Sequence, residues 1–412
     1  MIKVQNSYPQ IKFVVLLLLM ASLPFAIKVS NALILVSVLI SILPFFLERK
    51  KPLINWLAIL AVLFLLWEAL SLLYTKNENI RTGLSELETH LPFLFVPFIF
   101  RDSEILMDRK KYLSLAFVAG CLIASLFCLI VNIQLSLVEG QLFHEFYFSH
   151  DRISDPIGMQ AVYFALYISL CVLIITNHLL HTFSRNSNLK NMGLGILLIY
   201  FLLMIVASGA RTTIVALMLI MILNMVAYAI VNKKYKLLII SSFIPIFFVS
   251  LVLFNPVVKT RFGDLRHTKT EGSNYDSYFA RINIWKPGLD VLRHNILLGV
   301  GIGDQQEELN SSYNKNNYFA GVEFRFNMHN QYMQVMLATG IIGLSIFLLI
   351  LGLQIISAIR NYNFLYLSFI LLFSLASLTE STLNRSKGVV LFTLFSFIFY
   401  NSLAISSNKR TS

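Results

Sequence analysis

The chain has 412 residues, of which 57% are hydrophobic and only 13% are charged, and its mean hydropathy is +0.72. These values exclude an ordinary soluble globular protein and indicate a membrane protein, because a water-exposed surface needs more charge. The formal net charge is +12. Cys121, Cys128 and Cys171 all lie in apolar runs, so no disulfide framework is predicted.

The apolar runs are continuous rather than alternating, which indicates helices and not a β-barrel. A helix needs about 20 mostly apolar residues to cross roughly 30 Å of hydrocarbon, so the sequence predicts an all-α, polytopic membrane protein of about twelve transmembrane helices. The expected spans are residues 11–27, 31–48, 53–73, 83–100, 112–137, 157–178, 190–208, 211–231, 236–254, 329–356, 362–380 and 386–404.

Two of these spans need comment. The first follows Lys12 and could be a signal peptide, but further spans follow at once and no small-residue cleavage site closes it, so we interpret it as a span. The fourth is the weakest, because Glu86, Glu88 and His90 lie in its first turns before Pro92 opens an apolar stretch. It could be partly interfacial.

Lys and Arg in short loops set the orientation of a membrane protein. They gather in the segments that are cytoplasmic if the N-terminus is inside, such as 49–51, 109–111 and 233–236. We therefore expect both termini in the cytoplasm, and anionic headgroups rather than nucleic acid as the partner of the positive charge. The expected organisation is helices one to nine in 1–254, a large outer loop in 255–328, and helices ten to twelve with a cytoplasmic tail in 329–412.

The loop 255–328 is the one stretch with a soluble composition. Within it, the segment from Tyr278 to Leu298 has apolar residues near helical spacing, which predicts an amphipathic helix on the membrane surface. These residues are Ile282, Trp285, Leu289 and Leu292. Pro287 lies inside the segment and could instead end a short turn.

Three basic residues far apart in sequence are expected at the same outer face: Arg211, Arg281 and His329. An arginine at the edge of a span is costly, although snorkelling toward headgroups would explain Arg211 alone. A cation at the start of a helix opposes the helix dipole unless an anion is near, so Arg281 indicates either a bound phosphate or a surface pair with Asp276 or Asp290.

His329 begins the tenth span, where a histidine can accept a proton at neutral pH; a helix cap or a plain hydrogen bond is the alternative. The glycines of Gly299-Val300-Gly301-Ile302-Gly303 do not follow a strand, so a dinucleotide site is excluded and a tight backbone turn is expected. The outer histidines lack the spacing of metal ligands, so neither a metal nor a cofactor is predicted.

The order of these motifs resembles the O-antigen ligase and polymerase superfamily of bacterial envelope glycosyltransferases. The resemblance covers roughly a third of the chain, and each motif alone is weak. The matching motifs are Ser208-Gly209-Ala210-Arg211-Thr212, Arg281-Ile282-Asn283-Ile284-Trp285, Leu298 to Gly303, His329-Asn330-Gln331-Tyr332 and Ala338 to Leu344.

The resemblance implies that a glycan on undecaprenyl diphosphate is transferred to an acceptor sugar hydroxyl at the periplasmic face of the bacterial inner membrane. In this scheme Arg211 and Arg281 bind the diphosphate, and His329 is the catalytic base of an inverting, metal-independent transfer. Glu380 and Arg385 could pair with one another or orient the site, and Arg152 could assist at the diphosphate. Aromatic residues of the loop could stack on sugars: Tyr313, Tyr318, Phe324 and Phe326.

Three functions remain open from the sequence. A ligase places the glycan on the lipid A core, and the compact loop with its His-Asn pair favours this interpretation. A polymerase would join the glycan to a second lipid-linked repeat unit. A transporter or flippase of lipid-linked sugars is disfavoured because transporters place polar sites near the bilayer midplane, whereas these spans are nearly free of charge apart from Glu68.

Overall fold

The computed structural model describes residues 2–48, 55–100, 109–140, 145–148, 150–182, 188–235, 243, 250 and 277–411. All regular elements in these segments are helices, which confirms the all-α prediction. In the first part of the chain the helices are α1 (Ile2–Ser22), α2 (Ile27–Glu48), α3 (Trp56–Ser71), α4 (Ile80–His90), α5 (Pro92–Ile99), α7 (Lys110–Val138), α8 (Ala161–Thr182), α9 (Asn188–Ser208) and α10 (Arg211–Val231).

From residue 277 onward, the described residues form six more helices: α13 (Ser277–His294), α14 (Gln305–Lys315), α15 (Phe319–Glu323), α16 (Gln331–Arg360), α17 (Phe364–Ala376) and α18 (Ser386–Thr411). Short 3₁₀ turns occupy the connections Leu72–Tyr74, Asn77–Asn79, Glu145–Phe148, His150–Ile153 and Asp155–Ile157.

Seven helices of the described residues are long and apolar enough to cross a membrane: Trp56–Tyr74, Lys110–Val138, Ala161–Thr182, Leu189–Ser208, Arg211–Val231, Gln331–Arg360 and Ser386–Leu403. Three shorter apolar helices cover Tyr8–Ser22, Ile27–Ile42 and Phe364–Ala376. The expected fourth span is divided into α4 and α5, with Pro92 opening the second piece. The ninth, 236–254, lies outside the described residues apart from positions 243 and 250. The protein is a multi-pass membrane protein, and the count of about twelve spans stays a prediction.

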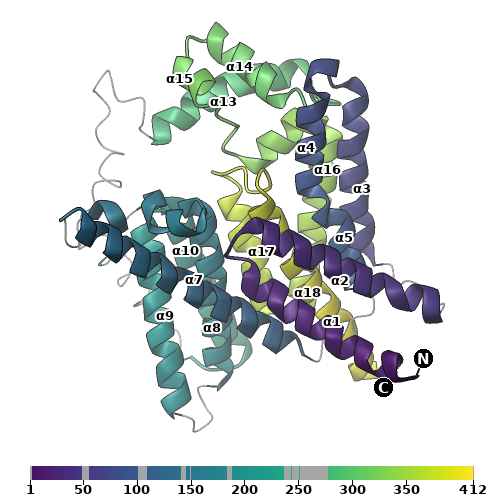
Figure 1. Cartoon of the computed structure of the whole chain (residues 1–412), viewed down its shortest axis with the longest axis vertical. Coiled ribbons are helices and arrows are strands. Elements are labelled where there is room, and N and C mark those ends of the chain that lie inside the picture. The colour runs from purple at the N-terminus through teal and green to yellow at the C-terminus, as the bar shows by residue number, and fades with distance from the viewer. Residues whose placement is uncertain are drawn as a thin grey trace.

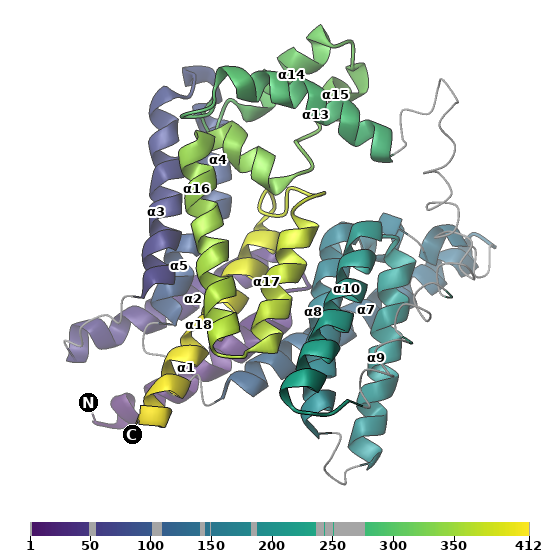
Figure 2. The same ribbon diagram turned by 180° about the vertical axis from the view of Figure 1, so that it is seen from behind.

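Helices α13, α14 and α15 form a cap at one end of the molecule, and both chain termini lie at the opposite end (Figures 1 and 2). Below the cap, α18 is the most enclosed of the long apolar helices. In an apolar stretch of 18 residues, 83% of the residues of α18 are buried, compared with 33% in the helix that contains α3. Phenylalanine rings fill the centre: Phe392 of α18 lies 4.4 Å from Phe373 of α17, and Phe395 lies 4.8 Å from Phe117 of α7. The exposed leucines of α3 are suited to face lipid.

The expected amphipathic helix in the loop is α13, which runs through Pro287 without a break. It buries Ile284 and Leu292 against Leu309, Tyr313 and Met328. Ile282 and Leu289, two of the residues whose spacing predicts a membrane-facing side, are exposed. The cap therefore has a small core of its own, and whether α13 lies on the membrane stays a prediction.

The glycine motif docks into a break in α16. At Gly340 the backbone of α16 leaves the helical region (φ 66°, ψ −166°), and a Cβ there would overlap the Leu297 carbonyl. Three carbonyls freed by the break accept hydrogen bonds from other segments: Leu337 from Val300 N–H at 2.8 Å, Ala338 from Gly301 N–H at 3.0 Å, and Thr339 from Trp67 Nε1–H at 3.0 Å. Broken helices persist in membranes only where such groups find partners.

A second attachment fixes the cap to the α3–α4 connection. The buried carboxylate of Asp304 accepts hydrogen bonds from Lys76 N–H at 3.0 Å and from Asn79 Nδ2–H at 2.6 Å. Ile302 N–H donates to Ser71 Oγ at 3.0 Å. The cap is thus attached to the C-terminal end of α3 as well as to the N-terminal part of α16.

Candidate functional site

The three basic residues selected from the sequence lie at the starts of three helices. Arg211 is the first residue of α10 and follows the left-handed Gly209 (φ 64°). Arg281 is the fifth residue of α13, and His329 precedes α16, whose N-cap is Asn330. The positive ends of helix dipoles attract anions, so cations at these positions indicate a place where negative charge is expected.

The turn between α17 and α18, residues 377–385, is the frame on which the site is built. Side chains and backbone groups of four other helices or their caps hold its peptide carbonyls. From the start of α16, Gln331 N–H donates to Ser377 O at 2.8 Å and Asn330 Nδ2–H donates to Leu378 O at 3.0 Å. From α13, Arg281 Nη2–H donates to Thr379 O at 3.2 Å. Tyr163 Oη–H of α8 donates to Ser381 O at 3.1 Å, and His90 Nε2–H of α4 donates to Leu383 O at 3.0 Å. A turn with so many of its carbonyls held in this way has little freedom to move.

Arg281 connects the cap to this turn and shares its surroundings with two other charged residues. Burial is the main cause that lowers the pKa of its guanidinium; the Glu380 carboxylate acts in the opposite direction and the Arg211 charge lowers it further. Electrostatic influence of this kind places Arg211, Arg281 and Glu380 in one neighbourhood. An arginine stays protonated in proteins, so this partly desolvated charge favours an anion beside it.

His329 faces Glu380. Its Nδ1 lies 3.5 Å from Glu380 Oε2, with the two side chains 30% and 15% exposed. The backbone of His329 is in the left-handed region (φ 44°), and its N–H donates to Asn327 Oδ1 at 2.9 Å. The carboxylate orients the imidazole through Nδ1, which leaves Nε2 for another partner.

Trp285 ties α13 to the backbone beside His329. It lies one helical turn after Arg281, and its Nε1–H donates to Met328 O at 2.9 Å. One face of α13 therefore touches both the 377–385 turn and the residue before His329. This arrangement fixes the distance between the guanidinium and the imidazole.

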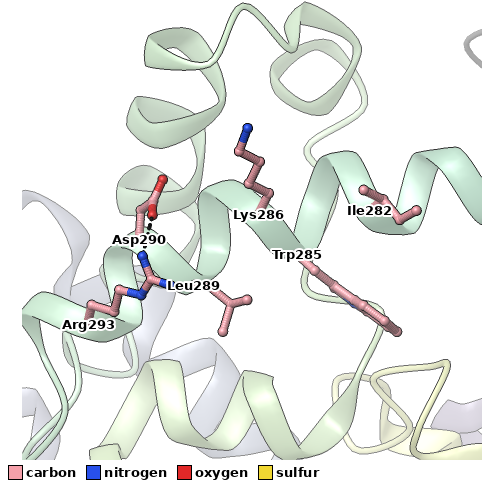
Figure 3. Close-up of a pocket in the computed structure, with 6 residues that line it drawn as sticks. All are labelled: Ile282, Trp285, Lys286, Leu289, Asp290 and Arg293. Atoms are coloured by element: carbon pink, nitrogen blue, oxygen red, sulfur yellow. Dashed lines mark ion pairs between the residues drawn. The ribbon is translucent and has the colours of Figure 1, made fainter.

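A shallow cavity of about 320 Å³ opens beside this face of α13 (Figure 3). It is lined by Ile282, Trp285, Lys286, Leu289, Asp290 and Arg293. Trp285 and Leu289 extend to the same side of the helix in Figure 3, while Arg293 Nη1 lies 3.7 Å from Asp290 Oδ1. The cavity has an apolar floor and a charged rim, and the Trp285 indole separates it from the backbone of Met328.

Of the supporting residues, Arg152 lies apart from this arrangement and Arg385 lies in the same turn as Glu380. Arg152 is exposed in the turn His150–Ile153, with Nη1 3.8 Å from Asp155 Oδ2. Arg385 is exposed at the end of the 377–385 turn. The structure thus brings together Arg211, Arg281, His329 and Glu380, while Arg152 has a local acidic neighbour of its own.

Several contributors carry no signal in the sequence. Thr379 acts through its backbone carbonyl, and Asn327 and Gln331 act through amides that look like ordinary loop and helix-start residues. In the described part of the chain, no three His, Cys, Asp or Glu side chains lie close enough together to hold a metal ion. The polar groups of the site are those of anion binding and proton transfer.

Residues 196–348 match the family model described as O-antigen ligase. The matched segment contains Arg211, Arg281 and His329 and ends before the turn that carries Glu380. No curated protein matches the chain. The resemblance to the O-antigen ligase and polymerase superfamily is confirmed, and the match supports a function of that type.

Proposed function

We propose that this protein is an inverting glycosyltransferase of the ligase type. It moves a glycan from undecaprenyl diphosphate to a sugar hydroxyl of the lipid A core at the periplasmic face of the bacterial inner membrane. The observation that supports this most strongly is the 377–385 turn, where Thr379 holds Arg281 and Glu380 faces His329. This arrangement supports a site in which diphosphate binding and proton acceptance occur side by side.

Arg211 and Arg281 bind the diphosphate in this proposal. Guanidinium groups offer planar, bidentate donors to phosphate oxygens and keep their charge at every physiological pH. They stabilise the negative charge that builds up on the leaving diphosphate, which is the role a metal ion has in other transferases. The proposed reaction uses no metal or cofactor.

His329 acts as the general base. Its Nε2 takes the proton from the acceptor hydroxyl while that oxygen forms a bond to the anomeric carbon. The bond from the anomeric carbon to the diphosphate oxygen breaks, its electron pair leaves with the diphosphate, and the configuration inverts. Glu380 stabilises the imidazolium that forms, because its carboxylate lies 3.5 Å from Nδ1.

Purified protein in liposomes tests the proposal directly. The substrates are an undecaprenyl diphosphate-linked glycan and a lipid A core acceptor, and the products are separated by size and by anomeric configuration. We expect the glycan to appear on the core with inverted configuration, together with free undecaprenyl diphosphate.

Two outcomes would replace the proposal with another function. Elongated lipid-linked glycan in the absence of core would identify a polymerase that joins repeat units. Redistribution of the lipid-linked glycan across the bilayer without any new glycosidic bond would identify a transporter or flippase.

A further inference from the structure

Two ionisable side chains are buried together beneath the 377–385 turn. Glu68 of α3 is 2% exposed and His90 of α4 is 6% exposed. His90 Nδ1 lies 2.8 Å from Glu68 Oε2, and the imidazole has Phe64 and Phe93 as ring neighbours at 6.4 and 6.1 Å. A buried ion pair seldom stabilises a protein more than apolar side chains of the same volume would. Stability alone therefore does not account for this pair.

The other ring nitrogen of His90 points at the turn. Nε2 lies 3.0 Å from Leu383 O, and it must carry a proton because a carbonyl oxygen can only accept. If Glu68 is ionised, both ring nitrogens are protonated and the pair is neutral overall. If Glu68 holds the proton, it donates to Nδ1. In both cases Nε2–H is fixed as a donor to Leu383.

The peptide groups of Leu383 are also held from the opposite direction. Leu383 N–H donates to Oε1 of Gln331 at 2.7 Å, and Gln331 is the first residue of α16, two positions after His329. The Leu383 backbone is therefore held between α4 and α16. Glu380 lies three residues before it in the same turn.

We propose that Glu68 and His90 are positioning residues for glycan transfer. They fix Leu383 and thereby place the Glu380 carboxylate against His329 and the Thr379 carbonyl against Arg281. This inference rests on the proposed function, since it assigns the pair to the same site. Neither residue touches a substrate. Their effect reaches the reaction through a backbone segment of four residues, Thr379 to Thr382.

Two double variants distinguish the effect of the hydrogen bond donated by His90 Nε2–H from the effect of the buried charge. His90→Gln with Glu68→Gln keeps an N–H group near the position of Nε2 and introduces no unpaired charge. His90→Phe with Glu68→Leu keeps the volume and removes the donor, again without an isolated charge. A displacement of about 1 Å at a reacting group can cost roughly 100-fold in rate. We expect the Gln pair to retain kcat within about threefold and the apolar pair to lose about 10- to 100-fold in kcat.

A third variant serves if the apolar pair does not insert into the membrane. His90→Asn with Glu68→Gln has the polarity of the Gln pair, but its amide is one methylene too short to reach Leu383. We expect it to lose activity where the Gln pair does not. Tyr366→Phe is the matched structural control, because it removes a buried hydrogen bond to Gln354 Oε1 at 3.0 Å between α16 and α17, at the end of α17 away from the turn. It should lower the melting temperature and leave kcat unchanged.

A double-mutant cycle with Glu380→Gln tests whether the pair acts through Glu380. We expect the apolar pair to cost less in that background than in wild type, since one of the two groups it positions has already lost its charge. The same loss in both backgrounds would overturn the inference, as would a folded apolar pair with normal kcat. A wild-type protein that transfers no glycan would overturn the proposed function and this inference together. Normal transfer by wild type and by both the apolar and Asn variants would overturn this inference alone.

Discussion

Arg281 and His329 are held by one turn, whereas Arg211 belongs to a different group of helices. Arg281 donates to Thr379, His329 faces Glu380, and α13 and α16 both attach to the 377–385 turn. Arg211 starts α10, which packs with α8 and α17, and helices α7 to α10 lie together on one side of the molecule (Figures 1 and 2). A diphosphate that contacts both arginines would therefore connect the two groups. The base and its orienting carboxylate lie on one side only.

The largest effect is expected from His329→Ala. Removing a general base typically costs about 10²- to 10⁴-fold in rate, so kcat should fall by that factor while the donor KM stays the same. His294→Ala is the control, because this exposed histidine of the same cap donates through Nδ1–H to Asp290 O in its own helix at 2.7 Å. Normal transfer by a correctly inserted His329→Ala protein would show that His329 is not the general base.

Arg281→Lys should have the next largest effect. Lysine keeps the charge but lacks the planar fork that can bond Thr379 and a phosphate at once, so we expect kcat/KM to fall by about 100-fold, or ~2.7 kcal/mol. Arg211→Lys should cost about tenfold if Arg211 acts mainly through its charge. Arg293→Lys, on the exposed side of α13, is the control. Equal losses of kcat/KM in the two variants would show that Arg211 and Arg281 bind the diphosphate in the same way.

Glu380→Gln should lower kcat by about tenfold, which corresponds to ~1.4 kcal/mol. The amide has nearly the same shape, but it lacks the negative charge that stabilises the imidazolium during transfer. Glu323→Gln, on the exposed end of α15, provides a change of the same kind outside the site. Unchanged kcat in Glu380→Gln would mean that the carboxylate only caps the turn.

Gly340→Ala tests, by its effect on stability, the break in α16 to which the cap is attached. The left-handed backbone and the nearby Leu297 carbonyl leave no room for a Cβ, so we expect a loss of about 1–3 kcal/mol and a lower melting temperature in detergent. Gly352→Ala lies in the same helix with open space around it and should be neutral or more stable by up to about 1 kcal/mol. A stable Gly340→Ala protein would contradict the role of the break in holding the cap.

Arg152→Ala should have the smallest effect. The side chain is exposed beside Asp155, outside the group formed by Arg211, Arg281 and His329. We expect transfer within about twofold of wild type, because exposed ion pairs contribute little. A loss of tenfold or more would extend the diphosphate site to the connection between α7 and α8.

Much of the fold could be predicted because apolar runs report helices directly. The all-α class, the weakness of the fourth span and the helix around Trp285 all follow from spacing and hydropathy. The apolar spacing of α13 was predicted, but its partners in the cap were not: Ile284 and Leu292 pack with Leu309 and Met328. Helical periodicity places residues on faces, but it does not say which neighbour covers a face.

The site was predictable only in part. The types and order of Arg211, Arg281 and His329 indicated anion binding and proton transfer. The turn that contacts Arg281 and His329 was not indicated, because Arg281 meets it through the Thr379 carbonyl and the turn is far away in sequence. Glu68 was visible as an unusual charge in a span, yet its connection to Leu383 passes through His90, which lies 293 residues from Leu383. No local pattern encodes such a contact.

The starts of α10, α13 and α16 near the three basic residues have one more consequence. In the proposed function, the positive ends of these three helix dipoles lie near the residues that would bind the diphosphate. Part of the attraction for an anion therefore belongs to the backbone and cannot be removed by changing any side chain. A protein without both guanidinium groups should still concentrate phosphate esters weakly at this end of the molecule.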